Sequence, residues 1–277
     1  MKDNRSAYVH SLQLLPGALG QHILSDPVIF QRIVRAARLS PTMNVLEIGA
    51  AFGNLTSFLC MNARHVIAVE KDTRFTPYLT DLQRKYHNLD VVFTDILSFT
   101  LPSCDVIVGS IPFHITEPLI EKMLASSVHS FVFVVGEHYY HALSQRKKEK
   151  LSLLSRSYFS FRKVLEIPKS SFTPPPRTNA IVLTLQRKTK GKLPYVLFIF
   201  RELFEQRDKK LKNALREAFT REHAQRGVVL TKNQARKMVS FLDLTTRIEE
   251  TYIESLSNQD IERLYKKVEK LRTRILA

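Results

Sequence analysis

Asn44-Val45-Leu46-Glu47-Ile48-Gly49-Ala50-Ala51-Phe52-Gly53 is the stretch that decides the fold of this 277-residue chain. Its first half is an apolar run typical of a buried strand, and a helical pattern follows its last glycine. Glycine is favoured where a backbone turns sharply and approaches a ligand closely, and the next helix offers free N–H groups at its start. The stretch therefore predicts a strand, a tight turn and a helix, and a turn without a ligand is the alternative.

The same alternation continues outward from this stretch. Further strands are predicted at residues 66–69, 90–93, 105–108 and 131–135, and helices at 55–61, 74–86 and 117–125. Near-continuous apolar runs of this length fit strands that are covered on both faces, as in a parallel sheet. Repeated strand–helix pairs predict an open α/β sheet.

Two more strands are predicted at residues 163–167 and 180–186, as a hairpin-like pair that closes the sheet edge. Between them stands Phe172-Thr173-Pro174-Pro175-Pro176. Proline cannot donate a ladder hydrogen bond, so this segment is predicted to be a loop. After residue 187 the apolar period becomes helical. We therefore predict two domains, an α/β domain over residues 1–188 and a smaller all-helical domain over residues 191–277.

Composition limits the class of protein. Hydrophobic residues make up 44% of the chain, which is enough for a sizeable core and argues against a disordered protein. The net charge is +16, and residues 189–277 hold 20 Lys and Arg against 12 Asp and Glu. Such a balance indicates a polyanionic partner, nucleic acid before all others, with a basic membrane-associated protein or general solubility as alternatives.

The two cysteines, Cys60 and Cys104, stand in no metal-ligand spacing, so neither a zinc site nor a disulfide framework is expected. No apolar run is long enough to span a bilayer. We therefore expect a cytoplasmic protein that is not inserted in a membrane. Nothing in the sequence requires more than a monomer.

Acidic residues end the next two predicted strands. Glu70 follows Gly49 by 21 positions, where a carboxylate can accept hydrogen bonds from a ribose diol, and Asp95 can accept from an adenine amino group. In open α/β sheets, ligands bind at the carboxyl ends of the strands. Together these residues predict an adenosine-containing ligand. A dinucleotide would fit as well, and surface carboxylates without a ligand are the alternative.

The fourth predicted strand runs into Ser110-Ile111-Pro112-Phe113. Methylation of an exocyclic amine is difficult because its lone pair is delocalised into the base. Acceptors for the amine's N–H groups favour the nitrogen geometry that attacks a methyl sulfonium, and an aromatic face can hold a flipped base. The segment thus indicates an amine methylation site. The alternative is a simple turn with Phe113 in the core.

Taken together, the chain resembles the ribosomal RNA adenine N6,N6-dimethyltransferases, the family of the KsgA-type enzymes and the Erm resistance methyltransferases. The resemblance covers nearly the whole chain. It rests on the motifs at residues 20–24, 47–56, 69–70, 95, 110–113, 171–177 and 204–211.

This resemblance implies a Rossmann-like class I methyltransferase domain with a C-terminal helical domain, S-adenosyl-L-methionine as cofactor, and ribosomal RNA or a ribosomal subunit precursor as partner. It implies no metal. The residues that it places at the cofactor are His22, Leu24, Gly49, Glu70, Asp95 and Ser110. It places Ser110 between the methyl group and the target amine, and Phe113 and Phe172 against the faces of the flipped adenine. The helical domain would hold phosphates of the RNA.

The sequence departs from the family pattern at two positions. Ser110 stands where the family usually has Asn, whose carbonyl is the stronger acceptor. Loss of one well-placed electrostatic group can lower a rate by about 100- to 1000-fold, although a serine hydroxyl still accepts a hydrogen bond. Ala51 replaces the middle glycine of the family's loop, which puts a methyl group near the cofactor.

The predicted function is dimethylation of adenine N6 in ribosomal RNA, in small-subunit RNA during ribosome biogenesis. The sizeable helical domain favours this branch, whereas residues 108–113 also resemble the Erm branch, which acts on large-subunit RNA and confers antibiotic resistance. A second alternative is a catalytically weak descendant that binds RNA or DNA as an assembly or transcription factor. A methyltransferase for small molecules is disfavoured by the net charge.

Overall fold

The computed structural model describes residues 22–112, 115–145, 150–188 and 193–275. Within them the chain forms two compact units. One holds the described residues of 22–140 and 161–187, and the other those of 141–160 and 188–275.

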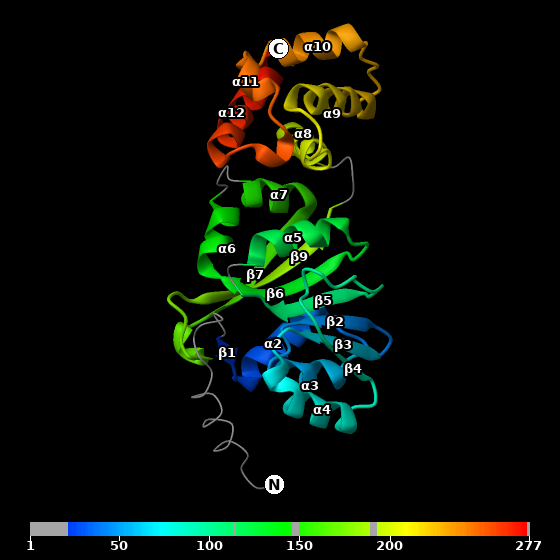
Figure 1. Ribbon diagram of the computed structural model, residues 1–277, viewed down its shortest axis with the longest axis vertical. Helices are drawn as coiled ribbons and strands as arrows, with labels where there is room; N and C mark the ends of the chain where they lie inside the picture. The colour runs from blue at the N-terminus through cyan, green and yellow to red at the C-terminus, as the bar shows by residue number, and fades with distance from the viewer. Residues whose placement is uncertain (1–21, 113–114, 146–149, 189–192, 276–277) are drawn as a thin grey trace. The chain divides into compact units, whose positions relative to one another are not determined.

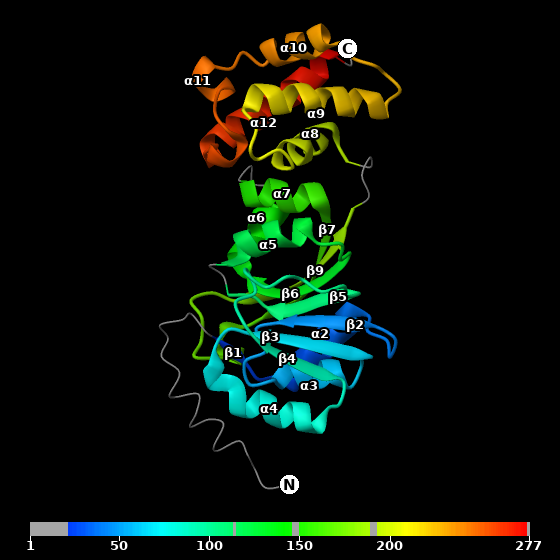
Figure 2. The same cartoon turned by 45° about the vertical axis from the view of Figure 1, so that its right-hand side comes forward.

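The first unit is built on a seven-stranded sheet with the order β4-β3-β2-β5-β6-β9-β7 (Figures 1 and 2). Its strands are β2 (Asn44–Ile48), β3 (His65–Glu70), β4 (Leu89–Phe93), β5 (Val106–Ser110), β6 (Ser130–Gly136), β7 (Phe159–Ile167) and β9 (Ala180–Arg187). The strands from β4 to β6 run parallel, and β9 is antiparallel to β6. The predicted open α/β sheet is confirmed.

Burial explains why these segments are strands. The first four residues of β5 and the last six of β6 are buried without alternation, as expected where both faces of a parallel sheet are covered. The connecting helices are α2 (Pro27–Ala37), α3 (Asn54–Cys60), α4 (Thr76–Lys85), α5 (Thr116–Ala125) and α6 (Glu137–Ser144), with a short 3-10 turn, η2 (Thr73–Phe75), before α4.

Helix α2 was not predicted from the sequence patterns. Capping interactions and backbone conformation determine where it begins and ends. The Asp26 side chain accepts a hydrogen bond from the Val28 N–H at 2.8 Å, and Pro27 occupies the first helical turn, where its missing N–H is not needed. Arg38 ends the helix in the left-handed region, with φ 52°. The helix packs on α3, β6 and β9.

The predicted proline-rich loop contains a short strand. Phe172–Thr173 forms β8, which pairs antiparallel with β1 (Ile23–Leu24), so that Leu24 lies opposite Phe172. The three prolines follow this ladder and do not take part in it. The pairing joins two segments that are far apart in the sequence. A local sequence pattern therefore does not predict this strand.

The second unit is helical. It contains α7 (Lys150–Tyr158), α8 (Tyr195–Phe204), α9 (Leu211–Gln225), α10 (Lys232–Ser240), α11 (Thr246–Glu249), α12 (Asn258–Ile275) and a 3-10 turn, η5 (Ile253–Ser255). All ten residues of α8 are buried, and the helix contacts α7, α9 and α12.

The division of the chain differs from the expected domains 1–188 and 191–277. Residues 141–160 belong to the helical unit. The reason is that Leu153 and Leu154 of α7 are fully buried and that α7 packs on α8. No described helix has the length and hydropathy needed to cross a bilayer.

Candidate active site

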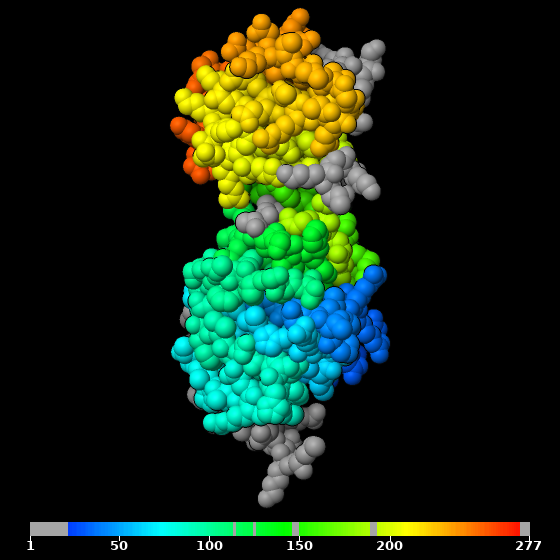
Figure 3. All heavy atoms as spheres, turned by 90° about the vertical axis from the view of Figure 1, so that its right-hand side faces the viewer, coloured from blue at the N-terminus to red at the C-terminus, as the bar shows by residue number. Residues whose placement is uncertain are grey.

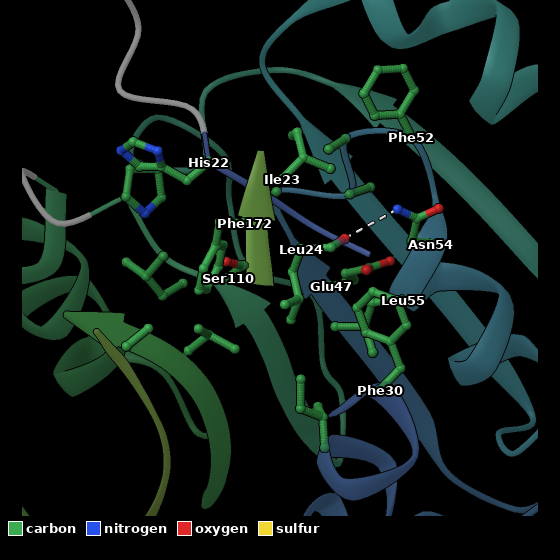
Figure 4. Close-up of a pocket in the computed structure, with 18 of the residues that line it drawn as sticks. His22, Ile23, Leu24, Phe30, Glu47, Phe52, Asn54, Leu55, Ser110 and Phe172 are labelled. Carbon is green, nitrogen blue, oxygen red and sulfur yellow. Dashed lines mark hydrogen bonds between the residues drawn. The ribbon is translucent and has the colours of Figure 1, made fainter. Parts of the chain in front are cut away.

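A cavity of about 320 Å³ opens at the carboxyl ends of the parallel strands (Figure 4). Gly49 follows β2, while Glu70 ends β3 and Ser110 ends β5. Six of the eight predicted site residues line the cavity, namely His22, Leu24, Gly49, Glu70, Ser110 and Phe172. Of the other two, Phe113 lies outside the described residues, and Asp95 is not among the lining residues.

The turn after β2 has the unusual backbone that its glycines predicted. Gly49 and Gly53 have φ values of 75° and 78°, in the left-handed region where side chains are disfavoured. A Cβ atom on Gly49 would come within 3.2 Å of the Ser110 carbonyl oxygen. The turn is anchored by a 2.9 Å hydrogen bond from the Gly49 N–H to the Val69 carbonyl. Glycine at position 49 thus lets the turn after β2 approach the end of β5.

Ala51 also adopts the left-handed region, with φ 48°. An L-residue in this conformation carries a strain of about 1–2 kcal/mol, which glycine relieves, while the greater freedom of unfolded glycine offsets about 0.4–1 kcal/mol. Ala51→Gly is therefore expected to raise the free energy of unfolding by about 0.5–1 kcal/mol. Urea denaturation measures this change. The neighbouring Ala50→Gly is the matched control and should lower stability; a loss of stability in both variants would contradict the strain.

Glu70 holds this turn through backbone hydrogen bonds. Its Oε2 accepts from the Ala51 N–H, and its Oε1 accepts from the N–H groups of Lys71 and Asp72, each at 2.8 Å. The residue is 6% exposed, and burial raises the pKa of its carboxyl although the three backbone donors act in the opposite direction. A carboxylate offers about four acceptor positions. One of them, on Oε2, is left for a ligand hydroxyl.

Asp95 makes local contacts in this structure. Its Oδ2 accepts from the Lys71 Nζ at 2.8 Å, and its Oδ1 accepts from the Leu97 N–H at 2.9 Å. The Lys71 ammonium lowers the pKa of the Asp95 carboxyl. The Lys71 side chain is 75% exposed, so water screens this ion pair and the pair is weak. The contact of Asp95 with an adenine remains a prediction.

Ser110 stands at the end of β5 because Gly109 precedes it. A Cβ atom on Gly109 would lie 2.5 Å from the carbonyl oxygen of Ile48, a distance that real Cβ atoms do not reach. Glycine therefore allows β5 to lie against β2 at this level. Just after Ser110, the Ile111 N–H donates to the Val134 carbonyl at 2.9 Å, which fixes the direction of the chain.

His22, Ile23 and Leu24 line one side of the cavity, as Figure 4 shows. The Asn54 side-chain amide donates to the Leu24 carbonyl at 3.2 Å, which ties β1 to the start of α3. His22 Nδ1 lies 2.8 Å from the Pro174 carbonyl oxygen. A carbonyl only accepts, so Nδ1 carries the hydrogen. Together with the β1–β8 pairing, these contacts hold Phe172, which is 5% exposed, in the cavity wall.

Two cavity residues, Glu47 and Asn54, were not predicted as site residues. Both lie within the motif at residues 47–56, but the sequence analysis gave neither side chain a role of its own. Glu47 is 1% exposed, and its Oε2 has no hydrogen-bond partner among the described residues. Burial raises the pKa of Glu47 to about 8. An acidic residue inside an otherwise apolar strand, just before a glycine turn, was the available clue.

The raised pKa of Glu47 predicts how stability depends on pH. Between its unfolded value of 4.5 and the folded value of about 8, the native state keeps a proton that the unfolded chain has released. The free energy of unfolding should therefore fall as pH rises through this window, by up to about 1.4 kcal/mol per pH unit. Urea denaturation at several pH values should show a weaker fall for Glu47→Gln. The exposed Glu254→Gln is the control; equal slopes for Glu47→Gln and the parent would contradict the prediction.

Within the described part of the chain, no three His, Cys, Asp or Glu side chains gather in a way that could hold a metal ion. The polar groups of the cavity are instead the carboxyls of Glu47 and Glu70, the Ser110 hydroxyl, the Asn54 amide, the His22 imidazole and backbone amides, beside an apolar wall. Such a set suits a nucleoside-sized organic ligand with hydroxyl and cationic groups.

Comparison with known proteins gives a family. The model of the family described as ribosomal RNA adenine dimethylase matches residues 17–250. "Ribosomal RNA small subunit methyltransferase A" of Thermotoga maritima is 34% identical over 205 residues, 72% of this chain and 73% of that protein. The protein of the same name from Staphylococcus epidermidis is 32% identical over 187 residues, 62% of this chain. That match spans 63% of the Staphylococcus protein, which is less than two thirds of its length.

Solved structures share the fold. A dimethyladenosine transferase from Plasmodium falciparum superposes with a TM-score of 0.61 at 23% identity, covering 91% of this chain and 98% of that one. The 23S rRNA methyltransferase ErmE gives 0.58 at 20% identity, covering 89% and 99%. Both likenesses support the α/β methyltransferase fold with a helical C-terminal part. Because the family model extends over most of the sequence, the chain belongs to the ribosomal RNA adenine dimethylase family.

Proposed function

We propose that the protein transfers methyl groups from S-adenosyl-L-methionine to N6 of an adenine in ribosomal RNA. The observation that carries this proposal is that five residues line the same cavity: Glu47, Gly49, Glu70, Ser110 and Phe172. The first three residues suit a nucleoside cofactor. The other two suit a base with an exocyclic amine.

The cavity residues fit this cofactor in three respects. Glycine at position 49 leaves free the place that a Cβ atom would occupy, 3.2 Å from the Ser110 carbonyl oxygen at the end of β5. Glu70 Oε2 keeps an acceptor position for a ribose hydroxyl. Glu47 is a buried carboxyl with an unpartnered oxygen, and a cationic ligand would offset its cost of burial. When bound, the cofactor supplies an electrophilic methyl group on a positively charged sulfonium.

The residues of the base side would then orient the target. The Ser110 hydroxyl accepts one N–H of the amine and favours the geometry in which the nitrogen lone pair points at the methyl group. Phe172 offers an aromatic face for a base taken out of its stack, and the family resemblance assigns the other face to Phe113. The apolar wall formed by Leu24, Phe172 and their neighbours excludes water. Orientation of this kind supplies much of the rate.

We further propose that small-subunit ribosomal RNA is the substrate, that both methyl groups are added, and that the helical unit binds RNA. The names of the curated relatives support the choice of subunit, and the net charge of +16 supports a nucleic acid partner. We also propose that the protein acts as a monomer in the cytoplasm, on a ribosomal precursor. Ser110 in place of the usual Asn favours one alternative, a catalytically weak RNA-binding assembly factor.

Transfer of labelled methyl groups to immature small ribosomal subunits, followed by nucleoside analysis, tests the proposal. Labelled dimethyladenosine is the expected product. Monomethyladenosine alone would mean that the Ser110 site stops after one transfer. Labelling of large-subunit RNA instead would support an Erm-type activity, and binding of subunits without label would support the assembly factor.

A further inference from the structure

We propose that one face of the helical unit, formed by α10 and the loop before it, is a binding surface for unpaired RNA. The α10 surface consists of the exposed residues Val229, Lys232, Arg236, Lys237 and Phe241. Helix α10 packs beside α9 (Figures 1 and 2), and both helices lie within the yellow to orange part of Figure 3. The choice of RNA as the polyanion rests on the proposed function.

The charge of this surface is unbalanced. Residues 226–242 hold four Lys and Arg and no Asp or Glu. Arg226 pairs with Glu222 at 2.6 Å. No ion pair in the described part of the chain involves Lys232, Arg236 or Lys237. Three cations within six positions are thus left to face solvent, which is what a site for a polyanion requires.

Other cations of the same unit are paired. Lys209 lies 2.7 Å from Glu217, Lys210 lies 2.9 Å from Glu250, and Arg221 lies 2.7 Å from Glu202. On these solvated helix faces, positive and negative side chains therefore alternate and pair with one another. The α10 surface differs from those faces, and general solubility does not require that difference.

The helix that carries the cations is well anchored. Thr231 and Gln234 form a capping box at its start, and Ala235, Met238 and Val239 are buried. Lys232 and Arg236 are four residues apart and therefore stand on the same side of the helix. The cations are presented by a folded element, which lowers the entropy lost when phosphates bind.

Two exposed apolar side chains complete the surface. Val229 is 88% exposed and Phe241 is 52% exposed. The Lys237 Nζ lies 5.8 Å from the centre of the Phe241 ring. An exposed aromatic ring beside the unpaired Lys237 suits an unpaired base stacked on the ring with its phosphate near that cation. An apolar protein partner would instead have to bury three unpaired charges, which is costly.

The first test removes the charges. The charge variant combines Lys232→Gln, Arg236→Gln and Lys237→Gln. The matched control combines three substitutions on α12, with the same loss of charge in the same unit: Arg263→Gln, Lys266→Gln and Lys270→Gln. Binding of a labelled single-stranded 20-nucleotide RNA is measured from 0.05 to 0.4 M salt. Loss of three phosphate contacts should weaken binding about 100-fold at 0.1 M salt and reduce the salt slope by about 2. The control should change affinity less than about threefold.

The second test removes the ring. Phe241→Ala should weaken binding of the same RNA by about 5- to 100-fold without a change in the salt slope, because stacking releases no counterions. Tyr252→Ala is the matched control, since Tyr252 is 46% exposed in the same unit. Equal binding by the charge variant and its control would overturn the proposal. A Phe241→Ala variant that binds like the parent would overturn base stacking.

Enzymatic assays separate this proposal from the proposed function. In the charge variant, KM for RNA should rise while kcat and cofactor affinity stay unchanged. If the parent transfers no methyl group but the α10 variants still lose RNA binding, then the proposed function fails and the surface stands. If methyl transfer proceeds and the α10 variants bind RNA and react like their controls, the surface fails alone.

Discussion

Ser110→Ala is expected to lower kcat for methyl transfer by about 100-fold. In the proposed function the substitution removes the side-chain acceptor that Ser110 provides for the target amine. It leaves the backbone in place, because alanine adopts the same φ and ψ as serine. Single-turnover transfer of labelled methyl groups to small-subunit RNA, with enzyme and cofactor in excess over the RNA, measures the chemical step.

A second variant, Ser110→Asn, tests whether an acceptor at this position determines the rate. It introduces the residue that the family resemblance implies at this position and should keep or raise the rate, since an amide carbonyl is a stronger and longer-reaching acceptor. Thermal unfolding of both variants should match the parent. If Ser110→Ala reacts as fast as the parent, the assigned role of Ser110 is wrong and orientation by the aromatic wall and the backbone carries the reaction.

Local patterns predicted the fold well because its strands are unusually uniform. The run Asn44–Ile48 forms β2 with the predicted bounds, and β9 extends the predicted strand by one residue. In a parallel sheet covered on both faces, most positions are apolar, so short apolar runs that alternate with helical patterns indicate strands. The sequence also indicated the turn at Gly49 and Gly53, because the left-handed backbone found at both positions favours glycine.

What the sequence concealed depends on contacts between distant segments. Phe172 and Leu24 are paired across 148 positions, and the prolines after Thr173 suggested only a loop. The residues of α7 form an ordinary amphipathic pattern, so nothing local assigns them to the helical unit. The Lys71–Asp95 ion pair joins the ends of two neighbouring strands. Each of these depends on which surfaces meet, and periodicity reports only which face of an element is apolar.

Glu70→Ala is expected to weaken binding of S-adenosylhomocysteine, measured by calorimetry, by about 10- to 100-fold through the loss of one hydrogen bond to a charged acceptor. A second loss comes from the turn, because the N–H groups of Ala51, Lys71 and Asp72 lose their common acceptor. Stability should fall as well, so the free energy of unfolding must be measured on the same samples, at a temperature where all variants are folded.

Glu70→Gln separates the two contributions. Its carbonyl oxygen can keep the two N–H donors of Lys71 and Asp72, but its amide group would face the Ala51 N–H with another donor. Affinity should therefore fall between that of the parent and that of Glu70→Ala. Asp95→Asn should have a smaller effect than Glu70→Ala, because the Asp95 side chain is 36% exposed and already paired with Lys71. If Glu70→Ala loses stability but binds the ligand with the parent's affinity, then Glu70 only braces the turn, and the ribose must be held by other groups of the cavity.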